Sequence, residues 1–186
     1  MHHRFMEDMS QHLASFNIAT LRYQFPYTER GSKRPDQKPL LLATVRAAVE
    51  FAGKISNGLP LLSGGKSMGG RMTSLAAAKE PFTDVHGIVF FGFPLHPAGE
   101  PSIERAEHLF DVKVPMLFLQ GTRDTLADLT LLNPICKKLG KRAALHIVND
   151  ADHSFHVPKR SGKTDQQVLA ELALKVAEWS KLVISR

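Results

Sequence analysis

The feature that most constrains this 186-residue chain is the regular alternation of short apolar segments with longer helical patterns. Five segments are rich in β-branched residues, Leu or Phe and are bounded by turn residues, so we expect strands at 18–25, 59–62, 87–91, 116–120 and 145–148. Most of them are almost continuously apolar. That pattern is typical of parallel strands that are covered on both faces.

Helical patterns occupy 5–14, 38–52, 68–78, about 126–139 and 164–184. Thr164 and Gln167 have the spacing of a capping box at the start of the last one. Apolar side chains then recur every three or four positions and predict a stripe against the sheet, with Trp179 in the core: Val168, Leu172, Val176, Trp179 and Val183. The alternation predicts an α/β fold, an open, mostly parallel, doubly wound sheet with helices on both faces and its ligand site at the carboxyl ends of the strands.

Composition fits one compact domain over residues 1–186, with 43% hydrophobic and 23% charged residues. The single Cys136 cannot form an internal disulfide, no apolar run approaches the ~20 residues of a membrane span, and the first residues do not resemble a signal peptide. We therefore expect a cytoplasmic protein with no membrane partner.

The formal net charge is +6, but the runs of basic residues have no interleaved aromatics, so we expect a solvated surface rather than a nucleic-acid site. The oligomeric state stays open.

Residues 61–72 combine an apolar strand, a serine flanked by glycines and the start of a helix: Leu-Leu-Ser-Gly-Gly-Lys-Ser-Met-Gly-Gly-Arg-Met. This G-x-S-x-G pattern is typical of a nucleophile elbow, which would lift the hydroxyl of Ser67 above the sheet. Gly65 and Gly69 are expected where side chains would collide with neighbouring backbone. The helix that follows favours developing negative charge, and the Met68 N–H is the candidate oxyanion donor.

The letters Gly65-Lys66-Ser67 also resemble the end of a phosphate-binding loop. That motif requires a glycine five residues before Gly65, where this chain has Pro60, and the residues between belong to the predicted strand. We therefore interpret Ser67 as a nucleophile rather than as part of a phosphate site.

A serine nucleophile needs a base and a third group that orients the base. Asp124 follows the predicted strand 116–120, and His153 follows the strand 145–148. The order serine, then acid, then histidine is that of the hydrolases with a nucleophile elbow. Asp128 is the alternative acid, although its position suits the first turn of a helix.

Among nine histidines, His156 is the main alternative base because it lies three residues after His153. His146 lies within a predicted strand, His108 has the pattern of a surface helix position, and His96 lies in a loop that could line the site. The sequence has no HExxH motif and no cysteine pair, so no metal site is expected.

Four segments, 64–72, 91–97, 117–124 and 152–155, together resemble the small, cap-less α/β-hydrolases related to dienelactone hydrolase. The resemblance implies Ser67 as nucleophile, Asp124 as orienting acid and His153 as base, with no cofactor or metal. Dienelactone hydrolases use cysteine, so Ser67 indicates the serine branch and makes a dienelactone substrate doubtful. The candidates to line the substrate site are Lys66, Pro94, Leu95, His96 and Phe155.

One departure from that family concerns the N-terminus. There, a strand ending in a His-Gly-rich loop precedes the first helix and supplies the second oxyanion donor, and residues 1–186 contain no such strand. We therefore expect this sequence to be N-terminally incomplete. Segment 18–25 should then lie about two strand spacings, ~10 Å, from 59–62, or pair with it directly.

The sequence thus predicts a serine hydrolase of carboxylesterase or thioesterase type. Segment 93–114 holds about one helix, near 103–110, which is too short for a lid domain and favours small soluble esters or thioesters as substrates. The alternative hypothesis is a non-catalytic interaction protein of the same fold with an incomplete oxyanion hole.

Overall fold

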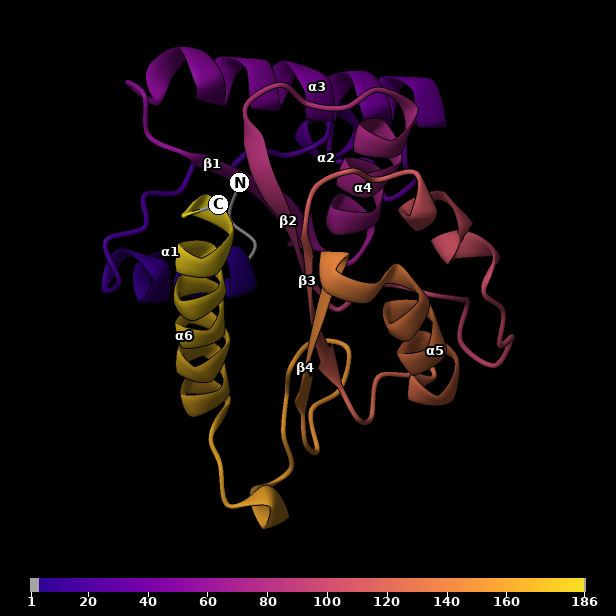
Figure 1. Cartoon of the computed structure of the whole chain (residues 1–186). Coiled ribbons are helices and arrows are strands. Elements are labelled where there is room, and N and C mark those ends of the chain that lie inside the picture. Colours follow the sequence, from indigo (N-terminus) through magenta and orange to yellow (C-terminus); the bar gives the residue numbers. More distant parts are fainter. Residues whose placement is uncertain (1–3, 186) are drawn as a thin grey trace.

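The computed structural model describes residues 4–185. Four strands form one sheet in the order β1 (Leu61–Lys66), β2 (Val85–Phe91), β3 (Met116–Gly121) and β4 (Ala143–Val148), and every neighbouring pair is parallel (Figure 1). Helices cover both faces of this sheet. The predicted α/β architecture is therefore confirmed, with four strands among residues 4–185 where five were expected.

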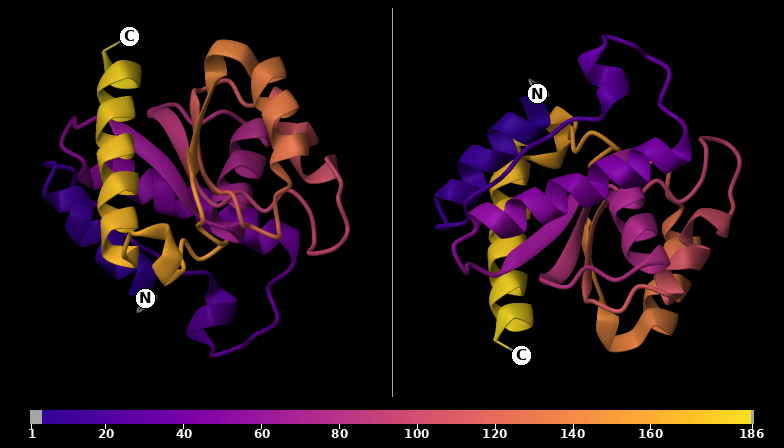
Figure 2. Two further views of the ribbon diagram at one scale, coloured as in Figure 1. Left: turned by 90° about the horizontal axis from the view of Figure 1, so that it is seen from below. Right: turned by 90° about the horizontal axis from the view of Figure 1, so that it is seen from above.

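The two faces of the sheet carry separate cores, and Figure 2 shows the helices on either side of the sheet. Helices α1 (Arg4–Ala14) and α6 (Asp165–Ile184) pack on the face that presents Val89 and Leu117. The opposite face presents Ile88 and Phe118 to a core that includes residues of α4 (Met68–Lys79), η1 (Glu104–Phe110) and α5 (Leu129–Leu139). Helix α3 (Lys38–Ile55) packs against α4 in a third cluster. The alternation of neighbouring strand residues between two cores explains why the strands are apolar throughout.

Helix α6 agrees closely with its sequence pattern. Thr164 and Gln167 form the predicted capping box, with reciprocal side-chain and backbone hydrogen bonds. The predicted stripe is buried along its whole length: Val168, Leu172, Val176, Trp179 and Val183. Cap and stripe together fix where the helix begins and which face meets the sheet.

Segment 18–25 was expected to be a strand, and this expectation is wrong. It is extended but lies outside the sheet, and it leads into the short helix α2 (Pro26–Glu29). Among residues 4–185, the only strand that pairs with β1 is β2, so the other edge of β1 has no strand partner and segment 18–25 forms no ladder with it. Leu21 and Tyr23 are accordingly 45% and 38% exposed. The direct pairing of this segment with β1 is not found, and the ~10 Å separation and the expectation of sequence before Met1 stay predictions.

Two smaller differences affect the site. Strand β1 begins at Leu61 and continues through both glycines to Lys66, because these residues pair in register with β2 as far as Phe91. The segment near 103–110, expected as a helix, forms the 3₁₀ helix η1. Ser67 therefore directly follows the last paired residue of its strand.

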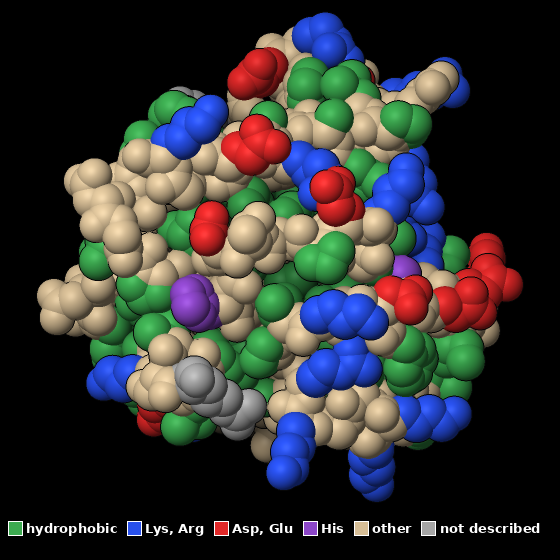
Figure 3. Space-filling view, turned by 45° about the horizontal axis from the view of Figure 1, so that its top comes forward, with side chains coloured by type: hydrophobic (Ala, Val, Ile, Leu, Met, Phe, Trp, Pro, Cys, Tyr) green, Lys and Arg blue, Asp and Glu red, His purple; other side chains and the backbone are tan. Residues whose placement is uncertain are grey.

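The surface carries both signs of charge. Figure 3 shows Lys and Arg side chains that are denser on the right half of one face, with Asp and Glu side chains among them. Within the part of the chain that the structure describes, no helix has the length and apolar character needed to cross a membrane.

Candidate active site

Ser67 lies at the sharp turn between β1 and α4. Its backbone has φ 52° and ψ −121°, a conformation that is strained for a residue with a side chain, and its N–H donates to the Phe91 carbonyl at 3.1 Å. Met68 is the first helical residue, where the N–H has no intrahelical acceptor. The turn therefore presents the Ser67 side chain and a backbone donor side by side, as a nucleophile elbow does.

Two glycines allow this turn, and one of them was not expected. A Cβ on Gly65 would lie 3.0 Å from the Gly70 nitrogen, and a Cβ on Gly70 would lie 2.8 Å from the Gly65 oxygen. A Cβ on Gly69 would meet nothing within 4 Å, so the expectation for Gly69 is wrong. The first turn of α4 packs against the end of β1 through Gly70 and leaves Gly69 on the open side.

The structure brings Ser67, His153 and Asp124 together. The Ser67 Oγ lies 2.8 Å from His153 Nε2, and His153 Nδ1 lies 2.7 Å from Asp124 Oδ2. The Asp124 side chain is fully buried, whereas the His153 side chain is 22% exposed. With the Nδ1 proton directed at the carboxylate, Nε2 is free to accept the serine proton.

Asp124 is held by donors other than the histidine. Its Oδ1 accepts from the Leu126 N–H at 2.8 Å, and its Oδ2 also accepts from the side-chain amide of Gln120. The Gln120 oxygen in turn accepts from the Phe93 N–H at 3.0 Å. Sequence reasoning missed Gln120, although a polar residue inside an apolar strand was a usable signal.

Lys66 contacts the loop that carries His153. Its Nζ donates to the backbone carbonyl of His153 and lies 5.3 Å from the ring centroid of Phe155 and 5.6 Å from that of Phe5. Burial lowers the pKa of Lys66 to about 8, against the opposing attraction of Asp124 and Asp152. Lys66 therefore braces the loop that carries His153.

Asp128, the alternative acid, and His156 and His146, the other histidines considered as base, have hydrogen-bond partners other than the relay residues. The Asp128 side chain caps α5 by accepting from the Thr130 N–H at 2.7 Å. His156 pairs with Asp165 at 2.9 Å, and His146 pairs with Glu171 at 2.8 Å. The structure places the Ser67 hydroxyl against His153 and not against these histidines.

His108 and Cys136 are both less exposed than a surface position would be. The expectation of a surface His108 is wrong, because its Nε2 lies 2.7 Å from the Ser74 Oγ between η1 and α4. Cys136 is buried in α5, and burial raises its thiol pKa to about 11. A thiol with so high a pKa is a poor nucleophile at neutral pH.

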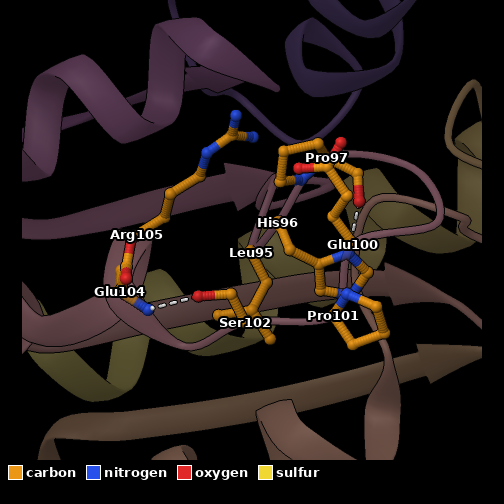
Figure 4. Close-up of a pocket in the computed structure, with 8 residues that line it drawn as sticks. All are labelled: Leu95, His96, Pro97, Glu100, Pro101, Ser102, Glu104 and Arg105. Atoms are coloured by element: carbon orange, nitrogen blue, oxygen red, sulfur yellow. Dashed lines mark hydrogen bonds between the residues drawn. The ribbon is translucent and has the colours of Figure 1, made fainter.

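Two of the five lining candidates border a cavity. Leu95 and His96 line a hollow of about 430 Å3 at the loop after β2, shown in Figure 4. His96 is buried, with Nδ1 2.8 Å from the Pro97 carbonyl and Nε2 accepting from the Asp128 N–H at 2.9 Å. Both ring nitrogens are therefore occupied by backbone, and the ring fixes the loop.

The other lining candidates are placed differently. Phe155 is 2% exposed and belongs to the core under α1 and α6, where its ring stacks on Phe5 with centroids 5.8 Å apart. Pro94 is buried, and Lys66 contacts the histidine loop as described. Neither the first cavity nor the second one, described below, is lined by Lys66, Pro94 or Phe155.

Across residues 4–185, no group of three or more His, Cys, Asp or Glu side chains is arranged to hold a metal ion. The hydroxyl, imidazole and carboxylate of Ser67, His153 and Asp124 lie together at the turn that begins α4.

Comparison with known proteins places this geometry in a family. Residues 1–181 match the model of the alpha/beta hydrolase domain. The chain belongs to the alpha/beta hydrolase family. In agreement, it resembles an α/β serine hydrolase without a lid from Xanthomonas campestris, with a TM-score of 0.71 and 22% identity over 96% of this chain and 75% of that one.

Two further solved structures share the fold of this hydrolase domain. One is an alpha-beta serine hydrolase homologue from Coxiella burnetii, with a TM-score of 0.73 and 16% identity over 94% of this chain and 76% of that one. The other is Est1E from Butyrivibrio proteoclasticus with ferulic acid bound, with a TM-score of 0.73 and 15% identity over 100% of this chain and 85% of that one. At these identities the likeness concerns the fold.

Proposed function

We propose that this α/β-hydrolase domain is a serine hydrolase that cleaves small carboxylic esters or thioesters through an acyl-enzyme. The observation that carries the proposal is the continuous relay from Ser67 Oγ through the His153 ring to Asp124, with links of 2.8 and 2.7 Å. Such a relay is the arrangement that turns a weak hydroxyl nucleophile into a reactive one.

In the first half-reaction, the Ser67 Oγ attacks the carbonyl carbon while its proton moves to His153 Nε2. The imidazolium is stabilised by Asp124, whose buried carboxylate accepts from the Nδ1–H. Collapse of the tetrahedral intermediate breaks the bond to the alcohol or thiol, which leaves with the proton from Nε2. The acyl group then remains as an ester of Ser67.

In the second half-reaction, water takes the place of the leaving group. Nε2 removes its proton, the oxygen attacks the acyl carbon, and the Ser67 oxygen leaves with that proton. The products are a carboxylic acid and an alcohol or thiol. In each tetrahedral intermediate the negative oxygen is assigned to the Met68 N–H, at the positive end of α4.

The remaining expectations from the sequence belong to this proposal. A relation to dienelactone hydrolase, a cytoplasmic location and a single domain over 1–186 stay predictions. The alternative, an interaction protein of the same fold without activity, predicts that the relay is present but that no ester is turned over.

The test is hydrolysis of p-nitrophenyl acetate by the purified chain, compared with Ser67→Ala and with Ser161→Ala as a matched control at a half-buried serine of the short 3₁₀ helix Lys159–Ser161. The proposal expects turnover in the wild type and in Ser161→Ala, and its loss in Ser67→Ala. Equal activity in all three would assign the turnover to another group and overturn the proposal, and no turnover in any of them would favour the interaction protein.

A further inference from the structure

A second cavity opens directly beside the proposed oxyanion donor. It measures about 490 Å3 and lies among α3, α4, η1 and the loop before α3, with Met68 on its wall. Arg71 and Arg105 line it together, from α4 and η1. The Arg71 N–H donates to the Ser67 carbonyl at 3.2 Å, so this arginine lies one helical turn from the candidate nucleophile.

Among residues 4–185, no acidic side chain pairs with either of these guanidinium groups. Within the described residues, the side chains of Arg71 and Arg105 form no hydrogen bond or ion pair with another residue. Burial, and next to it repulsion from Arg105, lower the pKa of Arg71. In Figure 4 the Arg105 guanidinium ends apart from the other labelled side chains. Two partly buried positive charges without partners are costly unless a ligand supplies the opposite charge.

His108 lies in the same positively charged environment. The Ser74 hydroxyl donates to the Arg71 carbonyl at 3.0 Å, so it accepts from His108 Nε2, and that nitrogen carries the ring proton. Burial first, then Arg71 and Lys38, lower the pKa of His108 to about 4, although Asp111 opposes them. A neutral ring thus lies on the wall of a cavity whose nearby charges are mainly positive.

Two carboxylates also line this cavity, and they do not cancel the arginines. Asp36 accepts from the Tyr27 N–H at 2.8 Å and from the Arg30 guanidinium, so its charge is already paired. Glu104 is exposed and forms no ion pair with Arg71 or Arg105. The charge left without an internal partner in the cavity wall is therefore that of Arg71 and Arg105, with Lys38 at the rim.

We infer that this cavity binds a carboxylate carried by the substrate, so that the hydrolase acts on esters whose acyl or alcohol part is anionic. The inference rests on the proposed function, because Met68 is the residue shared by the oxyanion position and the cavity wall. A guanidinium group suits a carboxylate because its planar N–H donors match two carboxylate oxygens.

The kinetic test compares charged esters with neutral counterparts. Monomethyl and dimethyl adipate test an anion on the acyl side, and 4-acetoxybenzoate and its methyl ester test an anion on the alcohol side. We expect kcat/KM to favour the charged member of at least one pair by tenfold or more. In Arg71→Gln/Arg105→Gln, that ratio should fall to near one. Equal kcat/KM within both pairs, or a preference unchanged in the double variant, would overturn the inference.

Matched variants separate a local site from general attraction. Lys137→Gln/Lys138→Gln removes two exposed positive charges from α5, outside the cavity, and should keep the full preference. Arg71→Lys/Arg105→Lys keeps the charge and should retain part of it, even if the glutamine variant folds poorly. A loss of preference in the α5 variant equal to that of the cavity variant would contradict a local site.

A binding measurement keeps this inference apart from the proposed function. Adipate, which has no ester bond, should shift the NMR resonances of the His108 ring in the wild type with a saturable dependence on concentration. It should fail to do so in Arg71→Gln. If no ester is hydrolysed but adipate binds in this way, the proposed function fails and the anion site stands. If esters are hydrolysed but adipate leaves the His108 resonances unmoved, the anion site is overturned.

Discussion

The Ser67–His153–Asp124 relay and the cavity beside it differ in whether their charged side chains have partners within the protein. In the relay, the buried Asp124 carboxylate accepts hydrogen bonds from Gln120, Leu126 and His153, so its charge has partners within the protein and does not depend on a substrate. In the cavity, Arg71 and Arg105 both line the wall, and neither has an acidic partner among residues 4–185. Hydrogen bonds within the protein hold the relay side chains in one geometry, whereas charged side chains without internal partners are left to bind a charged ligand.

Replacing a side chain of the relay tests the region whose geometry is held by internal hydrogen bonds, and it should lower activity more than any other change. Ser67→Ala and His153→Ala should each lower kcat for p-nitrophenyl acetate by about 10⁴-fold to 10⁶-fold, because members of a relay act as a unit. Steady-state kinetics of the two variants check this. A His153→Ala variant that keeps a tenth of the activity would show that the histidine is not the base.

Asp124→Asn tests whether the carboxylate orients the ring. The amide can present an N–H to His153 Nδ1, which favours the wrong tautomer, and a loss of about 10⁴-fold in kcat is expected. Asp128→Asn is the matched control, since asparagine also caps helices well, and it should leave kcat nearly unchanged. If Asp128→Asn were the more damaging change, the assignment of the acid would be reversed.

Gly92→Ala tests how tightly the histidine is positioned. Gly92 has φ +72°, and a Cβ there would lie 3.3 Å from His153 Nδ1 and 3.2 Å from Lys66 Nζ. Displacement of the ring by a fraction of an ångström should lower kcat by about 10²-fold. The preference between charged and neutral esters should persist, because this change does not touch the cavity. A loss of preference without a loss of kcat would contradict the separation of the two regions.

Lys66 offers a smaller, pH-dependent test of stability. Its pKa of about 8 in the folded protein lies below the ordinary value of 10.5, so the unfolded chain binds more protons between these two values. Lys66 therefore makes the free energy of unfolding rise with pH across this window, by at most ~1.4 kcal/mol per pH unit. Urea unfolding of wild type and Lys66→Met from pH 7.5 to 10.5 measures the difference. An identical pH dependence in both proteins would show that the ammonium is not buried as described.

His156→Ala should have the smallest effect. Its ring pairs with Asp165 at the surface, where both side chains are more than half exposed. We expect kcat for p-nitrophenyl acetate to stay within about twofold of wild type, since exposed ion pairs contribute little. Damage equal to that of His153→Ala would mean that the wrong histidine was assigned.

Much of the fold was predictable because its signals are local. The buried strands are continuously apolar, the last helix carries its cap in Thr164 and Gln167, and the turn at Ser67 follows from its glycines. The order of Ser67, Asp124 and His153 along the chain predicted which side chains would meet. Segment 18–25 misled because strand-like composition does not supply a neighbouring strand, and pairing is decided by the rest of the sheet.

The second cavity could not be predicted in the same way. Arg71 and Arg105 are 34 positions apart, and nothing in their local sequence indicates that α4 and η1 bring them together. His108 was misjudged because its partner Ser74 lies on another element. Gln120 was missed because its two hydrogen-bond partners become neighbours only when the loops after β2 and β3 pack together. Such residues are defined by tertiary packing rather than by a motif.

Reaction with a fluorophosphonate, followed by mass spectrometry of the digested protein, tests the central claim most directly. The account predicts one covalent adduct on Ser67, formed at neutral pH by the wild type and strongly reduced in His153→Ala, because phosphorus is attacked by an activated serine oxygen. An adduct on another residue, or labelling of Ser67 at the same rate without His153, would contradict it.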